Sequence, residues 1–333
     1  MIPFAQLPKV ELHLHLDCCL SFDVVKRIDP SVTEEEYKHN FIAPRKCLDL
    51  ADFLTRAVKG FALMQTKEQL QWVVRDLFQQ LKTDHVIYAE IRFAPLQHLE
   101  QGLTPHEVVA IVEAATAEAI KETGVEARLI LCTLRHFSET QSMETVKLVE
   151  AFKRTTVSGF DIAADEAGFP IDNHISAFKY AKEKNIFCTA HAGEAKGPES
   201  VWETLEHFGP SRIGHGVRSI EDEQLVAHLR KHKIHLEICP ACNVQINIYD
   251  EYKDHPIDKL YRAGVQLNVN TDARTITNIS LTREYEALHQ TFGWTAEDFY
   301  NCNIMAIDAA FIDDEIKKRL KDNLTMAYAP LLA

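Results

Sequence analysis

Two histidines, His13 and His15, stand two residues apart in the apolar run VELHLHL, residues 10–16. Side chains alternate between the two faces of a β-strand, so both imidazoles point to the same side, together with Glu11 and Asp17. Imidazole nitrogens are common ligands of zinc and similar metals. An isolated H-x-H pair more often reflects histidines that are satisfied by hydrogen bonds. The pair therefore predicts a metal site only if further ligands reach the same place.

Other titratable residues follow strand-like runs further along the chain. They are Asp165 and Glu166 after residues 159–164, His191 and Glu194 at the end of 187–192, His215 in 212–216, and Asp272 after 265–271. Bringing so many titratable groups together is costly unless a metal ion or a partner satisfies each of them. If they converge, His13, His15, His191 and Asp272 form a nitrogen and oxygen ligand set. Such a set suits a zinc ion that activates a water molecule.

The alternation of short β-rich runs with longer helical patterns predicts how these residues converge. Eight runs are typical of strands: 10–16, 86–94, 127–134, 159–164, 187–192, 212–216, 234–239 and 265–271. Helical patterns such as 104–124 and 220–232 lie between them. Strands that each lead into a helix predict an α/β fold, the (β/α)8 TIM barrel, whose strand ends meet at one C-terminal face. An open doubly wound sheet usually has a glycine-rich first turn, and none follows the first strand here.

The segment between the first two predicted strands is too long for a single crossover helix. We expect a helical lid insertion over roughly residues 20–80, in which residues 49–66 cover the barrel mouth. Three more helical patterns follow residue 280 and are expected at the C-terminal end. Because no Pro/Gly/Ser-rich linker interrupts the sequence, we expect residues 1–333 to form a single barrel domain.

Composition excludes some classes of function. The chain has a formal net charge of −13 and no block of lysines or arginines, which argues against a nucleic-acid partner because such binding needs a basic surface. No apolar run approaches the roughly 20 residues of a membrane span. The strand-like pattern begins by Val10, which leaves no room for a secretory signal. We therefore expect a cytoplasmic protein without a membrane partner, whose 8 cysteines stay reduced.

A second pattern of possible metal ligands occurs in HKIHLEICPAC, residues 232–242. Its H-x2-H-x3-C-x2-C spacing is compatible with a structural zinc site, and C-x-x-C alone is compatible with redox activity. A structural zinc site usually occurs in a small module with little core, whereas this segment is typical of a buried barrel strand. We expect Cys239 and Cys242 to be packing residues.

Several separate motifs resemble those of the adenosine deaminase family of the amidohydrolase superfamily, and they occur in the family's order. They are PKVELHLHLD (8–17), YAEIRFAP (88–95), TAHAGE (189–194), RIGHG (212–216), EICP (237–240) and NTD (270–272). The likeness extends from residue 8 to the last helices. It implies a hydrolase that converts adenosine or 2′-deoxyadenosine to inosine or 2′-deoxyinosine and ammonia, with a small purine nucleoside as its partner.

The resemblance also implies the roles of individual residues. One zinc ion per chain is bound by His13, His15, His191 and Asp272 and activates the water that attacks purine C6. The catalytic residues implied are Glu194, which protonates purine N1, and His215 with Asp272, which orient and deprotonate the water. The implied substrate-binding residues are His15, Asp17, Ala164, Phe53 and Phe61. Among these, Asp17 meets the ribose 5′-hydroxyl, and the phenylalanines belong to an apolar helical stripe at the ribose end.

Three positions near the substrate depart from the family pattern. Cys18 stands where the family usually has glycine. Ala164 replaces a glycine whose backbone N–H meets purine N3, and its methyl group is tolerable if φ stays negative. Ala273 and Arg274 replace the second aspartate and the proline of N-T-D-D-P, and that aspartate is a partner for purine N7. We expect Arg274 to be a solvated strand-end residue, or else to face the pocket and favour an anionic substrate.

These departures leave alternatives for the substrate. The enzymatic alternative is a deaminase of adenine or of a modified adenine nucleoside such as aminodeoxyfutalosine, although Asp17 favours a nucleoside over a bare base. A non-catalytic nucleoside-binding or signalling relative is the alternative from another class. It is disfavoured because the complete set of metal and acid residues is present. The sequence does not indicate the oligomeric state.

Overall fold

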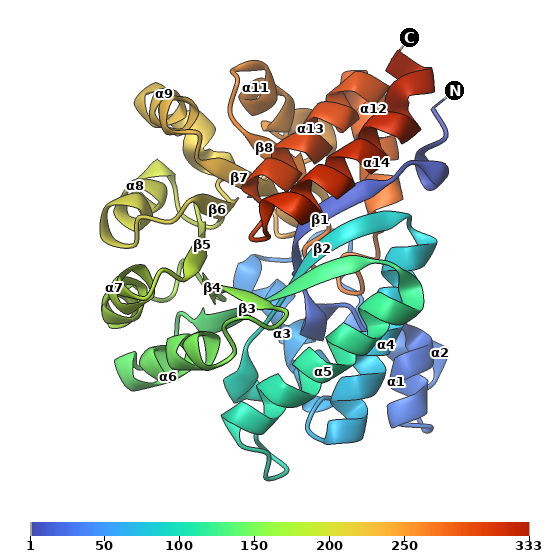
Figure 1. The fold of residues 1–333 in the computed structure, drawn as a ribbon, viewed down its shortest axis with the longest axis vertical. Coiled ribbons are helices and arrows are strands. Elements are labelled where there is room, and N and C mark those ends of the chain that lie inside the picture. The colour runs from blue at the N-terminus through green and yellow to red at the C-terminus, as the bar shows by residue number, and fades with distance from the viewer. Residues whose placement is uncertain (1, 333) are drawn as a thin grey trace.

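Eight parallel strands, paired in chain order, form the framework of the computed structural model, which describes residues 2–332 (Figure 1). The strands are β1 Lys9–His15, β2 Val86–Phe93, β3 Glu126–Leu134, β4 Val157–Ala163, β5 Phe187–Ala192, β6 Arg212–His215, β7 His235–Ile238 and β8 Leu267–Val269. Each of the eight predicted runs coincides with one of these strands, so the predicted barrel is confirmed.

The barrel closes just beyond β8, at Asp272. Leu14 in β1 and Asp272 form a parallel bridge. The backbone N–H of His15 donates to the carbonyl oxygen of Asp272 at 2.8 Å, and that of Asp272 donates to the carbonyl oxygen of His13 at 3.0 Å. The residues that close the barrel are therefore also predicted ligands of the metal.

Helices surround these strands. Those between β1 and β2 are α1 Phe22–Ile28, α2 Glu34–Phe41, α3 Leu50–Ala62 and α4 Lys67–Thr83. The later crossovers contain α5 Pro105–Thr123, α6 Glu139–Ala151, α7 Ile175–Glu183, α8 Pro198–His207, α9 Glu223–His232, α10 Pro240–Gln245 and α11 Ile257–Arg262. After β8 come α12 Leu281–Phe292, α13 Ala296–Ala309 and α14 Asp314–Leu332. Figure 1 shows α5 to α9 following one another around the outside of the strands, and α13 packs against β1 and β8.

Local sequence signals explain where these helices begin and how they pack. In α5, Thr104 and Glu107 form a capping box, and Gly124 ends the helix with a φ of 76°, as such caps require. The buried face of α3 includes Gly60, where an added Cβ would lie 2.0 Å from the carbonyl oxygen of Asp17. The glycine thus lets α3 lie directly on the chain that leaves β1. Within residues 2–332, no helix is long and apolar enough to cross a bilayer.

The barrel interior contains an ion network, whereas apolar layers usually fill it. Arg92 in β2 and Arg212 in β6 are fully buried. Arg92 contacts Asp161 and Glu237, each at 2.7 Å, and Arg212 contacts Glu237 at 2.7 Å through Nε. Buried charges of this kind are tolerated only when paired, and the network supplies the pairing.

Both expectations for Arg274 are wrong, because its side chain neither faces solvent nor lines the site. Only 5% of Arg274 is exposed. Its guanidinium lies 2.6 Å from Oε2 of Glu11 and 3.0 Å from Oδ2 of Asp84. Since Glu11 is fully buried on β1, the chain needs a cation there, and Arg274 supplies it.

Replacement of Arg274 tests this ion pair. Arg274→Met leaves the buried Glu11 and Asp84 carboxylates without their cation and should lower the free energy of unfolding by about 3–5 kcal/mol. Urea denaturation followed by circular dichroism measures the change. As a control, Arg75→Met removes the exposed pair with Glu118 and should cost about 1 kcal/mol or less. Equal effects of the two substitutions would show that Arg274 is not a structural cation.

Candidate active site

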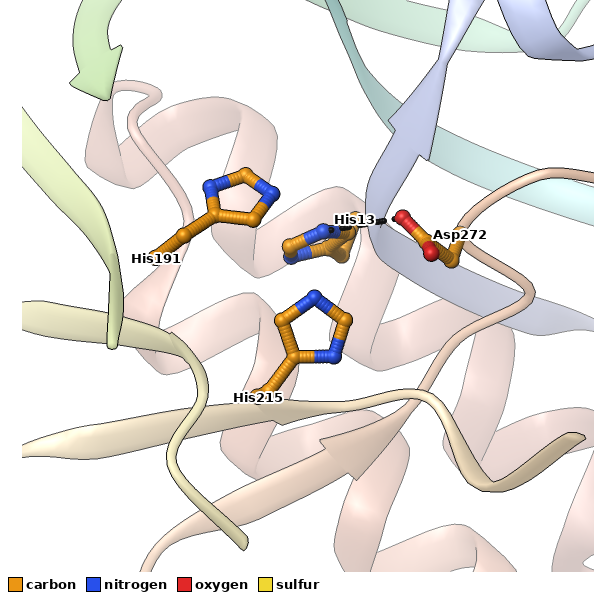
Figure 2. A group of neighbouring side chains, drawn as sticks. All are labelled: His13, His191, His215 and Asp272. Atoms are coloured by element: carbon orange, nitrogen blue, oxygen red, sulfur yellow. Dashed lines mark ion pairs between the residues drawn. The ribbon is translucent and has the colours of Figure 1, made fainter. Parts of the chain in front are cut away.

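Four side chains from different strand ends face one another at the mouth of the barrel (Figure 2). His13 comes from β1, His191 from β5 and His215 from β6, and Asp272 closes the barrel after β8. Their potential ligand atoms all lie within 4.8 Å of one another. His15 extends the group, because its Nε2 is 3.2 Å from Nε2 of His191 and 3.4 Å from Oδ1 of Asp272. The structure thus brings together the predicted metal ligands and His215.

The hydrogen bonds of His13 show that this site suits a cation. Nδ1 of His13 donates to Oε2 of Glu237 at 2.8 Å, so in the neutral ring Nε2 carries a lone pair. That nitrogen is buried without a hydrogen-bond partner and lies 3.2 Å from Oδ1 of Asp272. Two acceptors this close repel each other unless a proton or a cation lies between them.

His191 likewise turns a lone pair towards the group. Nδ1 of His191 donates to Asp161, with Oδ2 at 3.1 Å, which leaves its Nε2 as an acceptor facing Nε2 of His15. Burial lowers the pKa of both rings, so both are neutral near pH 7. Ligands that each bind zinc at about 2.0–2.1 Å lie about 3.3 Å apart in a tetrahedral site, close to the separations found here. One metal ion satisfies all these contacts at once.

Two carboxylates in the barrel interior fix the orientation of His13 and His191. Glu237 of β7 accepts from His13, and Asp161 of β4 accepts from His191. Arg92 pairs with both carboxylates and links them rigidly. Such partners select the tautomer of a ligating histidine and raise its basicity.

His215 reaches the site through an unusual backbone. It has a φ of 60° and lies between Gly214 and Gly216. A Cβ at Gly214 would lie 3.0 Å from Cε1 of His13, so glycine permits the close approach of β6 to the site. Asp272 also has a positive φ, 62°. Strain of this kind persists only where surrounding contacts impose it.

Glu194 follows β5 in a loop that one carboxylate organises. Oε1 of Glu166 accepts from the backbone N–H of Gly193 at 2.7 Å and from Oγ of Ser200 at 2.5 Å. Oε2 of Glu166 accepts from the N–H groups of Glu194 at 3.0 Å and Lys196 at 2.9 Å. Glu166 therefore fixes the position from which the Glu194 side chain reaches the site.

The carboxyl groups of Glu194 and Asp272 are held in opposite protonation states. Burial, together with the charges of Asp272 and Glu166, raises the pKa of Glu194 well above its usual value. Burial acts against ionisation of Asp272 as well, but contact with His13 and the neighbouring rings holds its pKa well below the usual range. Near pH 7, Glu194 is therefore an acid that can donate a proton, and Asp272 is an anion.

A cavity of about 380 Å³ opens beside His15, within the size range of small-molecule sites. Glu194 lines a neighbouring cavity of about 660 Å³, and Asp165 lines both. Of the predicted substrate-binding residues, His15, Asp17, Phe61 and Ala164 line the cavity beside His15. Burial raises the pKa of Asp17 to about 6. Phe53 does not line this cavity but lies in an adjacent apolar cluster.

The three departures from the family pattern have different structural outcomes. Ala164 has a φ of 78°, so the condition for tolerating its methyl group is not met, and the residue carries strain of about 1–2 kcal/mol. Cys18 lines the cavity and is 8% exposed. Ala273 is 2% exposed and belongs to the same apolar cluster as Cys18 and Phe53.

The second cysteine and histidine pattern is not a metal site in the part of the chain that the structure describes. Cys239 and Cys242 are buried free thiols in the apolar cluster, and His235 pairs with Asn268. Cys239 and Cys242 are thus packing residues, as expected. Sγ of Cys242 additionally lies 3.8 Å from Oε1 of Glu194.

Several residues that support the site were not assigned from the sequence. Arg92, Asp161 and Glu237 each stand inside an apolar strand, in EIRF, FDIA and LEIC. A charged residue inside an apolar strand indicates a buried partner of opposite charge. The sequence therefore contains a signal for the buried pairing of these three residues. Asn243 contacts both Glu194 and His215, and nothing in its local sequence distinguishes it.

A barrel with histidines and an aspartate converging at its C-terminal mouth defines a protein of the amidohydrolase superfamily. The family profile described as adenosine deaminase matches residues 8–327. The chain belongs to the adenosine deaminase family.

Individual relatives agree with this placement. An adenosine deaminase of Clostridium perfringens is 34% identical over 322 residues, which cover 95% of this chain and 97% of the relative. The crystal structure of an adenine deaminase from Arthrobacter aurescens has a TM-score of 0.89 at 25% identity, covering 96% of this chain and 98% of that one. An amidohydrolase from Burkholderia ambifaria, solved with bound zinc, has a TM-score of 0.90 at 22% identity. The match covers 99% of this chain and 92% of that one.

Removal of the carboxylate behind His191 tests the cation site. Asp161→Asn should weaken metal affinity by about 10–100-fold because His191 loses its orienting anion. Competition with a chelator, followed by metal analysis, measures the change. Asp258→Asn is a matched control, since Asp258 also pairs with a ring N–H, that of Trp294, and with an arginine, Arg262, but away from the site. Equal metal affinities in the two variants would contradict the assignment.

Proposed function

We propose that this protein is a hydrolytic deaminase that converts adenosine and 2′-deoxyadenosine to inosine and 2′-deoxyinosine, with release of ammonia. The observation that carries the proposal is the convergence at the barrel mouth of Asp272 and three histidines, with Glu194 3.4 Å from His215. The surroundings raise the pKa of Glu194 and lower that of Asp272, as an acid and an anionic base require. Relatives named adenosine deaminase support it at about one third identity over nearly the whole chain. The proposal includes one barrel domain over residues 1–333 and a cytoplasmic location.

The metal proposed is one zinc ion held by His13, His15, His191 and Asp272. The lone pairs that His13 and His191 turn towards Asp272 and His15, respectively, support the assignment, as does the zinc bound by a structural relative. When bound, zinc supplies a water molecule with a pKa lowered towards neutrality.

The side chains then divide the proton transfers between them. Glu194 donates its proton to purine N1, which makes C6 electron-poor. Water, oriented by His215, adds at C6, and Asp272 takes up the first proton that the water loses. The C6–N bond breaks when the amino group receives that proton and leaves as ammonia. The second proton of the water, on the C6 hydroxyl, returns to Glu194 as the C6 carbonyl forms. One water is consumed for each ammonia released.

The nucleoside fits this cavity better than free adenine does. Asp17 lines the cavity and offers an acceptor to a ribose hydroxyl that free adenine lacks. Ala164 offers a backbone N–H towards the purine, and Phe61 offers an apolar wall to the sugar. With a formal net charge of −13, the protein acts on the free nucleoside and not on nucleic acid.

The role of Glu194 is tested by substitution and by pH. Zinc-loaded wild type should release ammonia from adenosine, and Glu194→Gln should lower kcat by about 10²–10⁴-fold with zinc content unchanged. In wild type, kcat/KM should fall as pH rises through the raised pKa of Glu194, because only the protonated acid donates. Glu199→Gln, on the exposed start of α8, is the control and should keep full activity. Wild type that releases no ammonia from either nucleoside would refute the proposed function.

The charge of the substrate is tested with adenosine 5′-monophosphate. Arg274 pairs with Glu11 and Asp84, so it cannot attract a phosphate, and the Asp17 carboxylate repels one. We expect kcat/KM for the monophosphate to be at least about 100-fold below that for adenosine, since placing like charges together costs several kcal/mol. Asp17→Asn should reduce this difference in kcat/KM between adenosine and the monophosphate. A preference of wild type for the monophosphate would show that Asp17 does not meet the 5′ end of the nucleoside.

A further inference from the structure

Asn243 lies directly behind Glu194 and His215, two groups that act in the proposed reaction. Helix α10 places it there, and its side chain is fully buried. Its Nδ2 is 3.3 Å from Oε1 of Glu194 and 3.2 Å from Nδ1 of His215. A side-chain amide has two N–H hydrogens, so Asn243 can donate one to each of these acceptors.

His255 determines which way the Asn243 amide points. The backbone N–H of Ile257 donates to Nδ1 of His255 at 3.1 Å, so the neutral ring carries its hydrogen on Nε2. Burial lowers the pKa of His255 to about 3, and the ring is therefore neutral at working pH. Nε2 lies 3.2 Å from Oδ1 of Asn243. A flipped amide would set N–H against N–H, so the NH2 group must face Glu194 and His215.

The orientation of the Asn243 amide determines the tautomer of His215 and the contacts of Glu194. Nδ1 of His215 accepts from Asn243, so the neutral ring has its hydrogen on Nε2, the nitrogen turned towards His13 and Asp272. Oε1 of Glu194 accepts from Asn243 and from Sγ of Cys242, at 3.8 Å. The same oxygen lies 3.4 Å from Nδ1 of His215, so one amide group holds both of these atoms in place.

We propose that His255 and Asn243 form a positioning relay, which selects the tautomer of His215 and holds Oε1 of Glu194 beside it. The relay rests on the proposed function, because it matters only if Glu194 donates a proton and His215 orients the attacking water. Neither residue touches the substrate. Their effect is expected on kcat rather than on binding, since the groups they orient act as bonds are made and broken.

Substitution of His255 tests the relay in the zinc-loaded enzyme. His255→Phe removes the donor to Asn243 and should lower kcat for adenosine by about 10–100-fold, with KM and zinc content unchanged. His235→Phe is the matched control, because His235 is also 2% exposed and its Nε2 pairs with Oδ1 of Asn268 at 3.0 Å. This control should keep wild-type kcat. A kcat for His255→Phe equal to that of the control would overturn the proposal.

A second pair of variants covers the case in which His255→Phe does not fold. His255→Gln places an amide N–H near the position of Nε2, whereas His255→Asn, equally polar, does not reach it. The glutamine variant should have a kcat at least about 10-fold above that of the asparagine variant, and equal values would overturn the relay. A wild type inactive on both nucleosides refutes the proposed function and the relay with it. An active wild type with a fully active His255→Phe refutes the relay alone.

Discussion

Arg92 forms ion pairs with Asp161 and with Glu237, and each of these carboxylates holds one histidine of the active site. Without the guanidinium, Glu237 would keep only Arg212, and Asp161 would remain buried without an arginine partner, at a cost of several kcal/mol. With it, the charges are balanced. His13 then turns its free nitrogen towards Asp272, and His191 turns its free nitrogen towards His15. The geometry of the metal site is thus imposed from inside the barrel and not by its loops.

The same interior explains how two carboxyl groups at one barrel mouth have pKa values shifted in opposite directions. Asp272 stands among imidazole rings that favour its charge, while Glu194 lies in a buried loop whose neighbours include other anions. Glu166 contributes to both the position and the protonation of Glu194, because it binds the loop backbone and adds negative charge. Position and acidity therefore have a common cause in this loop.

The eight strands and the residues at their ends could be predicted because both depend on local patterns. Alternation identified β1, and each later ligand followed a strand whose composition was clear. Arg274 could not be predicted, since its burial depends on Glu11 and Asp84, which are far from it in sequence. The left-handed backbone of Ala164 is likewise invisible in the residue type, because alanine normally avoids it. The role proposed for His255 could not be predicted either, because this residue reaches Glu194 and His215 only through Asn243.

Closure of the barrel at Asp272 has a consequence for synthesis of the chain. His13 and His15 are among the first residues to leave the ribosome, whereas Asp272 follows only after most of the protein has been made. Because the bridge between Leu14 and Asp272 joins these distant parts, the proposed ligand set is complete only once the last strand has docked against the first. A chain that ends before Asp272 therefore lacks the carboxylate of the proposed ligand set and the bridge that closes the barrel around its histidines. Tight metal binding is therefore expected only of the completed fold.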